Sequence, residues 1–498
     1  MRHWLDHPTR SFWRVMGWLG ASVVFYGLIG LLGGPTEGDA AETVYSTWSI
    51  AHGNLGCAYP KAAVYHFDNL ANPFALTAPL YTLITGAASA LLRIGHGVAF
   101  PSQQQLGPSC DNAFVAMFHW SVNSSAILPT VRLSYLMWPI LMAGVIALVR
   151  ASGRGRQRWE PLALLMVACT PTAIMCLNYF FHPEDLLALG LILASVACSL
   201  RKRWLWAGVL IGLACSAQQF AILVAAPLLV VALGRHRIRY AVGAVITVAI
   251  IDIPIIFATS GRAIRTLLLG SSRVGVINRS TGGTVLWETN LRGTLLFLLS
   301  RVAPIVASMA LAWWASKRLG PRMLTPIPLV SLMATSLAIR LIFEENLFGY
   351  YFMAISVALI ILDIARGQIR GTVLAWIGLV TVAFNPVHAG FLSNLTGHTL
   401  NLYYAVPIVV LAIVVATVIF DAVFRRVRVY KIVWIGVVLL TSESKLWGMG
   451  NDVFNVSHWL WQVVLAPIAL GLAVKPLLIA CKSGAPSISV EEPDLVMP

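Results

Sequence analysis

The chain alternates between long apolar runs and short clusters of arginine and lysine, and this alternation constrains its fold most strongly. An apolar run of about 20 residues is long enough to cross the hydrocarbon core of a bilayer as an α-helix. Of the 498 residues, 58% are hydrophobic and 11% are charged, whereas about a quarter of the residues in a soluble domain are charged. The sequence therefore predicts an all-α, polytopic membrane helix bundle with about 12–14 membrane helices.

The formal net charge of +15 does not indicate a nucleic-acid-binding protein. The cations lie in short clusters between apolar runs, where they set the membrane orientation and meet anionic lipid headgroups. The basic residues within 2–14 place the N-terminus in the cytoplasm, so the apolar run near residues 15–32 leads to the outer side. We expect a multi-pass protein of the cytoplasmic (inner) membrane that contacts membrane lipids and no nucleic acid.

This orientation predicts a long first extracytoplasmic loop over residues 34–127, because the next strongly basic cluster is Arg150–Arg158. Within the loop, Pro73–Leu92 is apolar enough to be a further span. That alternative would place the basic cluster outside, against the positive-inside tendency, so we favour helices that lie in or dip into the outer interface. We expect one transmembrane domain over residues 1–480 and a disordered cytoplasmic tail over residues 481–498.

Residues 204–234 are apolar and are flanked by basic clusters, which places both ends of this stretch in the cytoplasm. About thirty residues are too few for two full spans of ~20 residues each. We therefore predict two short helices that meet near Gln218 and Gln219 at membrane depth. Irregular backbone is tolerated there only where it is buried in protein or lines a cavity.

Under this topology, the ionisable residues at the ends of apolar runs gather on the outer side. Ionisable groups at membrane depth are costly and are therefore candidates for function. Asp39 and Glu42 closely follow the first apolar run, and Asp39 is the leading candidate for a catalytic carboxylate. Two further groups come later in the chain: His182 with Glu184 and Asp185, and Arg340 with Glu344 and Tyr350.

Each group also has an ordinary structural explanation. The acids that follow His182 are typical of the first turn of a helix, and acids in loops are usually solvated. Arg340 and Glu344 are four residues apart, which is typical of an ion pair on one helix face. Their convergence on one side, with an outer loop that carries Arg273 and Arg279, favours a function. Arginine suits phosphate because its planar guanidinium group donates two parallel hydrogen bonds.

The cysteines and the loop motifs indicate which covalent links, cofactors and donors to expect. Cys57 and Cys110 are the two cysteines of the first outer loop; in an oxidising compartment they indicate a disulfide, and the alternative is two free thiols. Since the sequence contains neither a metal-type cysteine spacing nor a glycine-rich nucleotide loop, we expect no cofactor and a lipid-linked donor. Acids of the outer loops remain the alternative ligands for a divalent ion.

The motifs follow one another in a characteristic order. Gly38-Asp39 opens the long outer loop, His182-Pro-Glu-Asp185 and the apolar stretch Ala207–Gln219 follow, and Arg340, Glu344 and Tyr350-Tyr351 come late in the chain. This order resembles that of GT-C glycosyltransferases, in particular bacterial envelope enzymes of the mannosyl- and arabinofuranosyl-type that use polyprenyl-phosphate sugars. Where those enzymes often carry Lys-Gln, this chain has Gln218-Gln219. The resemblance implies a GT-C-type bundle and assigns the general base to Asp39.

The resulting hypothesis is an inverting transfer of a sugar to a lipid or glycan acceptor of the cell envelope. Asp39, with Glu42 beside it, would take the proton of the acceptor hydroxyl. The phosphate-binding residues would be Arg340, Arg273 and Arg279. The residues that orient donor or acceptor would be His182, Glu184, Asp185, Gln218, Gln219, Glu344 and Tyr350.

Two alternatives remain open. One is a transporter or flippase of a lipid-linked sugar, because broken helices also mark transporters. The other is a non-catalytic GT-C relative that acts in envelope assembly.

Overall fold

The computed structural model describes residues 45–59, 78–94, 110, 133–154, 159–168, 170–178, 181–264, 295, 298–344, 347, 349–384 and 458–482. Every regular element in these ranges is helical, and six of the described helices are long and apolar enough to cross a membrane. The predicted all-α, polytopic membrane bundle is thereby confirmed. The larger predicted number of membrane helices includes apolar runs near residues 15–32 and 403–440, which lie outside the described residues.

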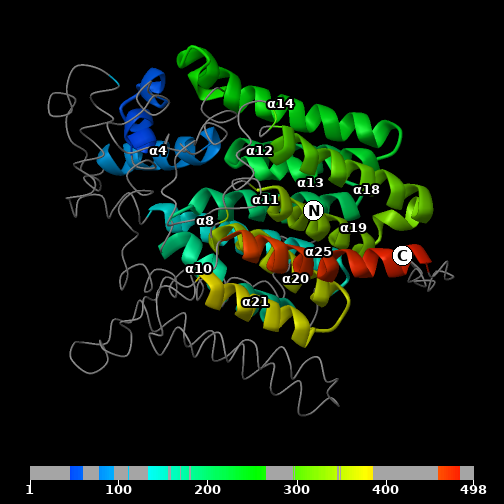
Figure 1. Cartoon of the computed structure of the whole chain (residues 1–498). Coiled ribbons are helices and arrows are strands. Elements are labelled where there is room, and N and C mark those ends of the chain that lie inside the picture. Colours follow the sequence, from blue (N-terminus) through cyan, green and yellow to red (C-terminus); the bar gives the residue numbers. More distant parts are fainter. Residues whose placement is uncertain are drawn as a thin grey trace, which may run out of the picture.

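The helices of the bundle have the following bounds: η1 (Leu55–Cys57), α4 (Pro79–Ile94), η3 (Ser134–Leu136), α8 (Met137–Ala151), α9 (Trp159–Ala168), α10 (Pro171–Asn178), α11 (Pro183–Leu200), α12 (Trp204–Ala217), η4 (Gln219–Ala221), α13 (Ile222–Val231), α14 (Arg235–Ala258), η6 (Leu298–Val302), α18 (Ala303–Leu319), η7 (Gly320–Leu324), α19 (Pro326–Phe343), η8 (Gly349–Tyr351), α20 (Phe352–Ala365), α21 (Gly371–Phe384) and α25 (His458–Lys482). Most of them run side by side along one common direction (Figure 1).

The bundle has central and peripheral helices. α11 and α19 are mostly buried by their neighbours, whereas α14, α18 and α25 expose much of their length. The exposed side chains of α14 are apolar, and they include Val245, Ile250 and Phe257. In a membrane, such a surface faces lipid chains, while the buried central helices bring their ends together inside the protein.

The predicted pair of short helices within residues 204–234 is confirmed. α12 ends at Ala217, and the extended backbone of Gln218 interrupts the helical path before η4 and α13 begin. With fourteen residues, α12 is only about 21 Å long, which is shorter than the ~30 Å hydrocarbon core. With the start of α12 at the cytoplasmic boundary, as the basic residues before it predict, a helix of this length places the break within the hydrocarbon core.

α12 and α14 pack against each other along glycine residues, in a register that has both helices running in the same direction. A Cβ atom on Gly208 would lie 2.1 Å from the carbonyl oxygen of Tyr240, and one on Gly212 would lie 2.7 Å from that of Ala244. This register places Gln218 about eight residues, or ~12 Å, short of the end of α14. The break between α12 and α13 is therefore recessed relative to the end of α14.

Ion pairs fix two turns at the opposite end of the bundle. Between α8 and α9, Arg150 donates hydrogen bonds from Nε and Nη2 to the two carboxylate oxygens of Glu160, both at 2.8 Å. Between α20 and α21, Asp363 accepts from the backbone N–H and the guanidinium of Arg370. Each of these four charged groups has an opposite charge beside it, so these turns need no ligand to balance them.

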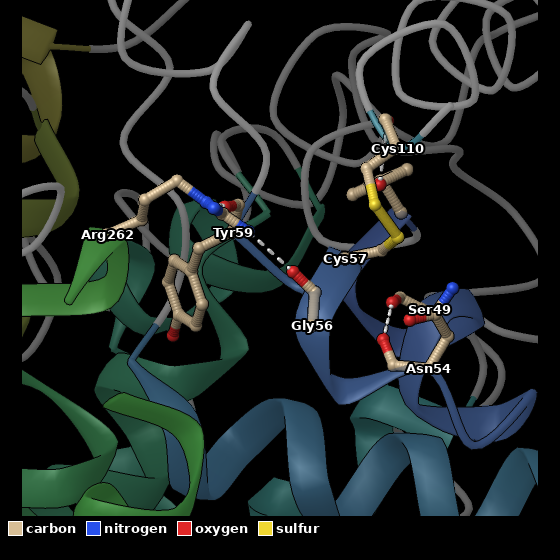
Figure 2. Close-up of a disulfide and its surroundings, with 8 residues drawn as sticks. Ser49, Asn54, Gly56, Cys57, Tyr59, Cys110 and Arg262 are labelled. Carbon is tan, nitrogen blue, oxygen red and sulfur yellow. Dashed lines mark hydrogen bonds between the residues drawn. A yellow bond between two sulfur atoms is a disulfide. The ribbon is translucent and has the colours of Figure 1, made fainter. Parts of the chain in front are cut away.

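The described parts of the first predicted outer loop are held against the end of α14. A disulfide joins Cys57 and Cys110, whose Cα atoms are 5.1 Å apart (Figure 2). Beside it, Arg262 donates to the carbonyl oxygens of Gly56 and Tyr59, both at 2.8 Å (Figure 2). These contacts bring segments that are about 200 residues apart in sequence to the same end of the bundle as Gln218.

Candidate functional site

Five helix ends meet in the interior of the bundle and bring a group of polar side chains together. These ends are the start of α11, the junction of α12 with η4, the turn η6 before α18, the end of α19 and the short helix η8. Each is a place where an apolar helix begins or stops, so its polar residues remain next to the core. We call this group the polar cluster; its members are His182, Glu184, Asp185, Gln218, Arg301, Arg340, Glu344, Tyr350 and Tyr351.

His182 and Glu184 form the first part of the polar cluster. Nδ1 of His182 is 2.9 Å from Oε1 of Glu184, and the imidazole stacks on the ring of Tyr350 with 4.0 Å between ring centroids. His182 is the N-cap residue of α11, yet its side chain makes no capping bond. Glu184 is only 2% exposed, and within the described part of the chain its Oε2 atom has no hydrogen-bond partner. These side chains therefore contact one another as well as forming the start of α11, and the Oε2 atom of Glu184 is a buried acceptor without a hydrogen-bond partner among the described residues.

Asp185 links α11 to the break between α12 and α13. Its Oδ1 atom accepts a hydrogen bond of 2.7 Å from Nε2 of Gln218, whose Oε1 in turn accepts from the backbone N–H of Gln219 at 2.9 Å. Asp185 also lies in the first turn of α11, where the helix dipole favours an acid. The amide of Gln218 thus ties the recessed break to the acid-bearing end of α11.

Arg340 is held by an ion pair and by contacts with two aromatic rings. Its Nε donates to Oε2 of Glu344 at 2.8 Å, which is the ion pair that their spacing predicts. The guanidinium lies 5.0 Å from the ring centroid of Phe220 and 4.6 Å from that of Tyr351. Because aromatic faces attract cations, this arrangement fixes the guanidinium between the hairpin break and η8.

A second arginine shares the same carboxylate. Nη1 of Arg301 is 3.3 Å from Oε1 of Glu344, so one buried carboxylate bridges two guanidinium groups. Arg301 lies on η6, a single π-helical turn that ends just before Pro304 near the start of α18. Arg301 is not among the site residues predicted from the sequence. Its signal was an arginine a few positions inside an apolar run, which is costly in a membrane.

Gln462 on α25 is another residue that the sequence analysis missed. Its Nε2 donates to the backbone carbonyls of Leu341, Ile342 and Glu344 at 3.0, 3.0 and 2.8 Å. The last carbonyls of a helix have no partner within the helix, so a side chain from another helix can satisfy them. Gln462 therefore fixes the end of α19 and the backbone position of Glu344.

The electrostatics of the polar cluster are close to balanced. Glu184, Asp185 and Glu344 are each 2% exposed, and buried acids require nearby cations or donors. Arg301 and Arg340 supply two positive charges, and a protonated His182 would supply a third. Such a cluster offers both carboxylate oxygens and guanidinium groups to a ligand that carries hydroxyl groups and a phosphate.

The other predicted site residues are not placed by the structure. Asp39, Glu42, Arg273 and Arg279 lie outside the described residues, so their roles stay predictions. Within the described part of the chain, no three His, Cys, Asp or Glu residues are grouped to hold a metal ion. The prediction of a metal-free reaction is not tested by this observation.

A comparison with protein families connects the polar cluster to a known class of enzyme. Residues 113–339 match the model of Glycosyltransferase family 87. This is a family of GT-C-type membrane glycosyltransferases, and the match covers 227 of the 498 residues. His182, Asp185, Gln218 and Arg301 lie inside the matched segment, and Arg340 follows its last residue. Among curated proteins, none matches the chain.

Proposed function

We propose that the chain is a membrane glycosyltransferase that uses a polyprenyl-phosphate sugar as its donor. The acceptor is a lipid or glycan of the cell envelope, and the transfer takes place on the extracytoplasmic side of the inner membrane. The observation that carries this proposal is the buried polar cluster within and directly after the segment that matches a glycosyltransferase family. The mannosyl- or arabinofuranosyl-type of the transferred sugar is a prediction from the resemblance of the motifs.

The polar cluster suits both halves of such a donor. The phosphate of the lipid carries negative charge, which the guanidinium groups of Arg301 and Arg340 would meet at membrane depth; Arg273 and Arg279 are further cations predicted for this role. The sugar presents hydroxyl groups, and one of these would donate a hydrogen bond to the Oε2 atom of Glu184. A polyprenyl chain is apolar and fits between the lipid-facing helices.

The proposed reaction is a single displacement with inversion. Asp39 takes the proton of the acceptor hydroxyl, and the acceptor oxygen forms a bond to the anomeric carbon. The bond between that carbon and the phosphate oxygen breaks, and the polyprenyl phosphate leaves with the electron pair. The arginines of the polar cluster stabilise the charge that develops on this leaving group.

The remaining residues of the polar cluster would position the substrates. His182, Glu184, Asp185 and Tyr350 surround the proposed sugar site, and Gln218, Gln219 and Glu344 hold the backbone and the arginines around it. Glu42 is predicted to assist Asp39. A positioning role is effective because correctly oriented reactants lower the entropic part of the barrier.

The test is turnover of a radiolabelled polyprenyl-phosphate sugar by purified protein in liposomes that contain envelope lipids. We expect the label to appear in an acceptor and unlabelled polyprenyl phosphate to accumulate in equal amount. Movement of the intact donor between leaflets without sugar transfer would instead support a flippase. Neither transfer nor movement, with a panel of hexose and pentose donors, would favour a non-catalytic role in envelope assembly.

A further inference from the structure

The carboxylate of Glu344 lies between two guanidinium groups, in a position where a phosphate group would also bind. We propose that Glu344 competes with the phosphate of the lipid carrier for binding to the two arginines. In this arrangement Arg301 and Arg340 form the phosphate site, and the incoming phosphate displaces Glu344 from Arg301. The proposal rests on the proposed function, which names a polyprenyl phosphate as the ligand of this site.

The two contacts of Glu344 differ in a way that makes partial displacement feasible. The bond from Arg340 is short, at 2.8 Å, and that guanidinium is also fixed between two aromatic rings. The bond from Arg301 is 3.3 Å long, whereas charge-assisted hydrogen bonds of this type are usually about 2.7–2.9 Å. An incoming anion would therefore bind Arg301 first, and the ion pair between Arg340 and Glu344 would remain.

The phosphate monoester that remains after sugar transfer is a stronger ligand for this position than a single carboxylate, because it carries three terminal oxygen atoms and a charge of about −1.5 to −2. The phosphodiester of the sugar donor carries one negative charge, as a carboxylate does, and arginine binds all of these groups through the same planar fork. The two guanidinium groups together exceed the charge of Glu344 by one. Because Glu184 and Asp185 add two further acids to the polar cluster, this excess does not by itself hold a second anion, and the phosphate binds by displacing Glu344 from Arg301.

The position of Arg301 gives a lipid phosphate a route to the site. Its side chain is 24% exposed, whereas that of Glu344 is 3% exposed. Further along the helix that follows, Val306, Ala310 and Trp313 are exposed and spaced four and three residues apart, so they share one face of α18. This apolar face runs from the region of Arg301 along the membrane direction. We infer that the isoprenoid chain lies on it while the phosphate meets Arg301.

This arrangement would also help the enzyme to release its lipid product. After sugar transfer, the polyprenyl phosphate remains bound to the arginines, and tight product binding commonly limits turnover. The return of Glu344 to Arg301 would weaken that binding without any large movement of helices. The contrasting role is purely structural: Glu344 would hold the arginines in place and so strengthen phosphate binding.

The two roles predict opposite effects of one substitution on ligand affinity. In Glu344→Gln, the shape is kept but the negative charge is removed. We expect farnesyl phosphate to bind about three- to tenfold more tightly to this variant, the range that corresponds to losing a partly buried ion pair. Binding of farnesol, which lacks the phosphate, should not change. Affinity would be measured by titration of the purified full-length protein in nanodiscs of phosphatidylcholine.

The matched control is Glu160→Gln, which removes another arginine-paired, buried glutamate at the opposite end of the bundle. It should leave the affinity for farnesyl phosphate unchanged. Inorganic phosphate would be titrated as well; a similar increase in its affinity would assign the effect to the phosphate group itself, whereas an increase confined to farnesyl phosphate would assign it to the lipid. Either result supports the displacement of Glu344.

Equal or weaker binding of farnesyl phosphate to Glu344→Gln would overturn the proposal. If that variant does not fold, Glu344→Asp tests the same point, because it keeps the charge but withdraws the carboxylate from Arg301. Arg301→Gln must weaken binding, and unchanged affinity in that variant would also refute the proposal. The predicted affinity change without any sugar transfer would refute the transferase function alone, and transfer with unchanged affinities would refute the displacement alone.

Discussion

Replacing Arg340 by lysine separates the charge of this residue from its shape. Lysine keeps one positive charge but has no planar fork, so it cannot reproduce the geometry of the Nε bond to Glu344 or place a guanidinium over the rings of Phe220 and Tyr351. The contacts of Arg340 with Glu344, Phe220 and Tyr351 are then weakened. We expect Arg340→Lys to fold, to be less stable, and to lose most of its turnover.

The size of the effect on stability follows from the contacts that are lost. A hydrogen bond to a charged group contributes about 1.5–3 kcal/mol. Weakening of the contacts with Phe220 and Tyr351 adds about 0.5–1 kcal/mol, since an ammonium still attracts an aromatic face. The free energy of unfolding should therefore fall by about 2–4 kcal/mol, less than the cost of deleting the charge and leaving Glu344 with one cation fewer.

The matched control is Arg150→Lys at the opposite end of the bundle. Arg150 makes two 2.8 Å bonds to Glu160, so this variant loses a comparable amount of stability without touching the polar cluster. Thermal unfolding in detergent, followed by tryptophan fluorescence, gives the stability of each variant. Sugar transfer, measured at a temperature where both variants are folded, gives the activity.

The comparison of the two variants decides the prediction. Both should unfold at lower temperature than the wild type, but only Arg340→Lys should lose turnover. Wild-type stability and turnover in Arg340→Lys would show that neither the planar fork nor the stacking of Arg340 matters. Equal losses of turnover in the two variants would show that activity follows general stability and would remove Arg340 from the site.

Three further predictions address other parts of the chain. Asp39→Asn should reduce turnover by about 10²–10⁴-fold, or ~3–5 kcal/mol of barrier, with unchanged donor affinity, because an amide cannot act as the base; near-normal turnover would exclude it. Non-reducing peptide mapping should recover Cys57 linked to Cys110, and reduction should destabilise the outer loop by about 2–4 kcal/mol; two free thiols in native membranes would contradict this. Gly208→Val should cost about 1–3 kcal/mol of stability, since its side chain meets a carbonyl of α14; Gly471→Ala, which points into open space, is the control and should cost much less.

The sequence was sufficient to predict the parts of the fold that depend on length and polarity. The break at Gln218 followed from an apolar stretch that was too short for two spans, and the structure has that break. The pair of Arg340 and Glu344 followed from a spacing of four residues, and it too is present. Both predictions rest on rules that act between residues close together in the chain.

The contacts that build the site depend on tertiary packing, and sequence spacing does not reveal them. Asp185 and Gln218 are 33 residues apart, and Arg301 and Glu344 are 43 residues apart. Gln462 reaches across 118 residues to the backbone of Glu344. Each of these polar residues lies in or next to an apolar helix, so the sequence shows that it is unusual but not which partner it contacts.

The described part of the first loop constrains how Asp39 can take part in the reaction. Arg262 fastens residues 56 and 59 near the end of α14, and Ser46 donates to the carbonyl of Ala58, so the chain from Tyr45 onward lies at that level. The polar cluster lies deeper in the bundle, because Gln218 is about 12 Å short of the end of α14 along the helix axis. Asp39 precedes Tyr45 by six residues, and six extended residues reach about 20 Å. Six residues are therefore long enough to span this distance along the bundle axis. In the proposed reaction, the acceptor would enter from the outer side and the lipid phosphate from the membrane.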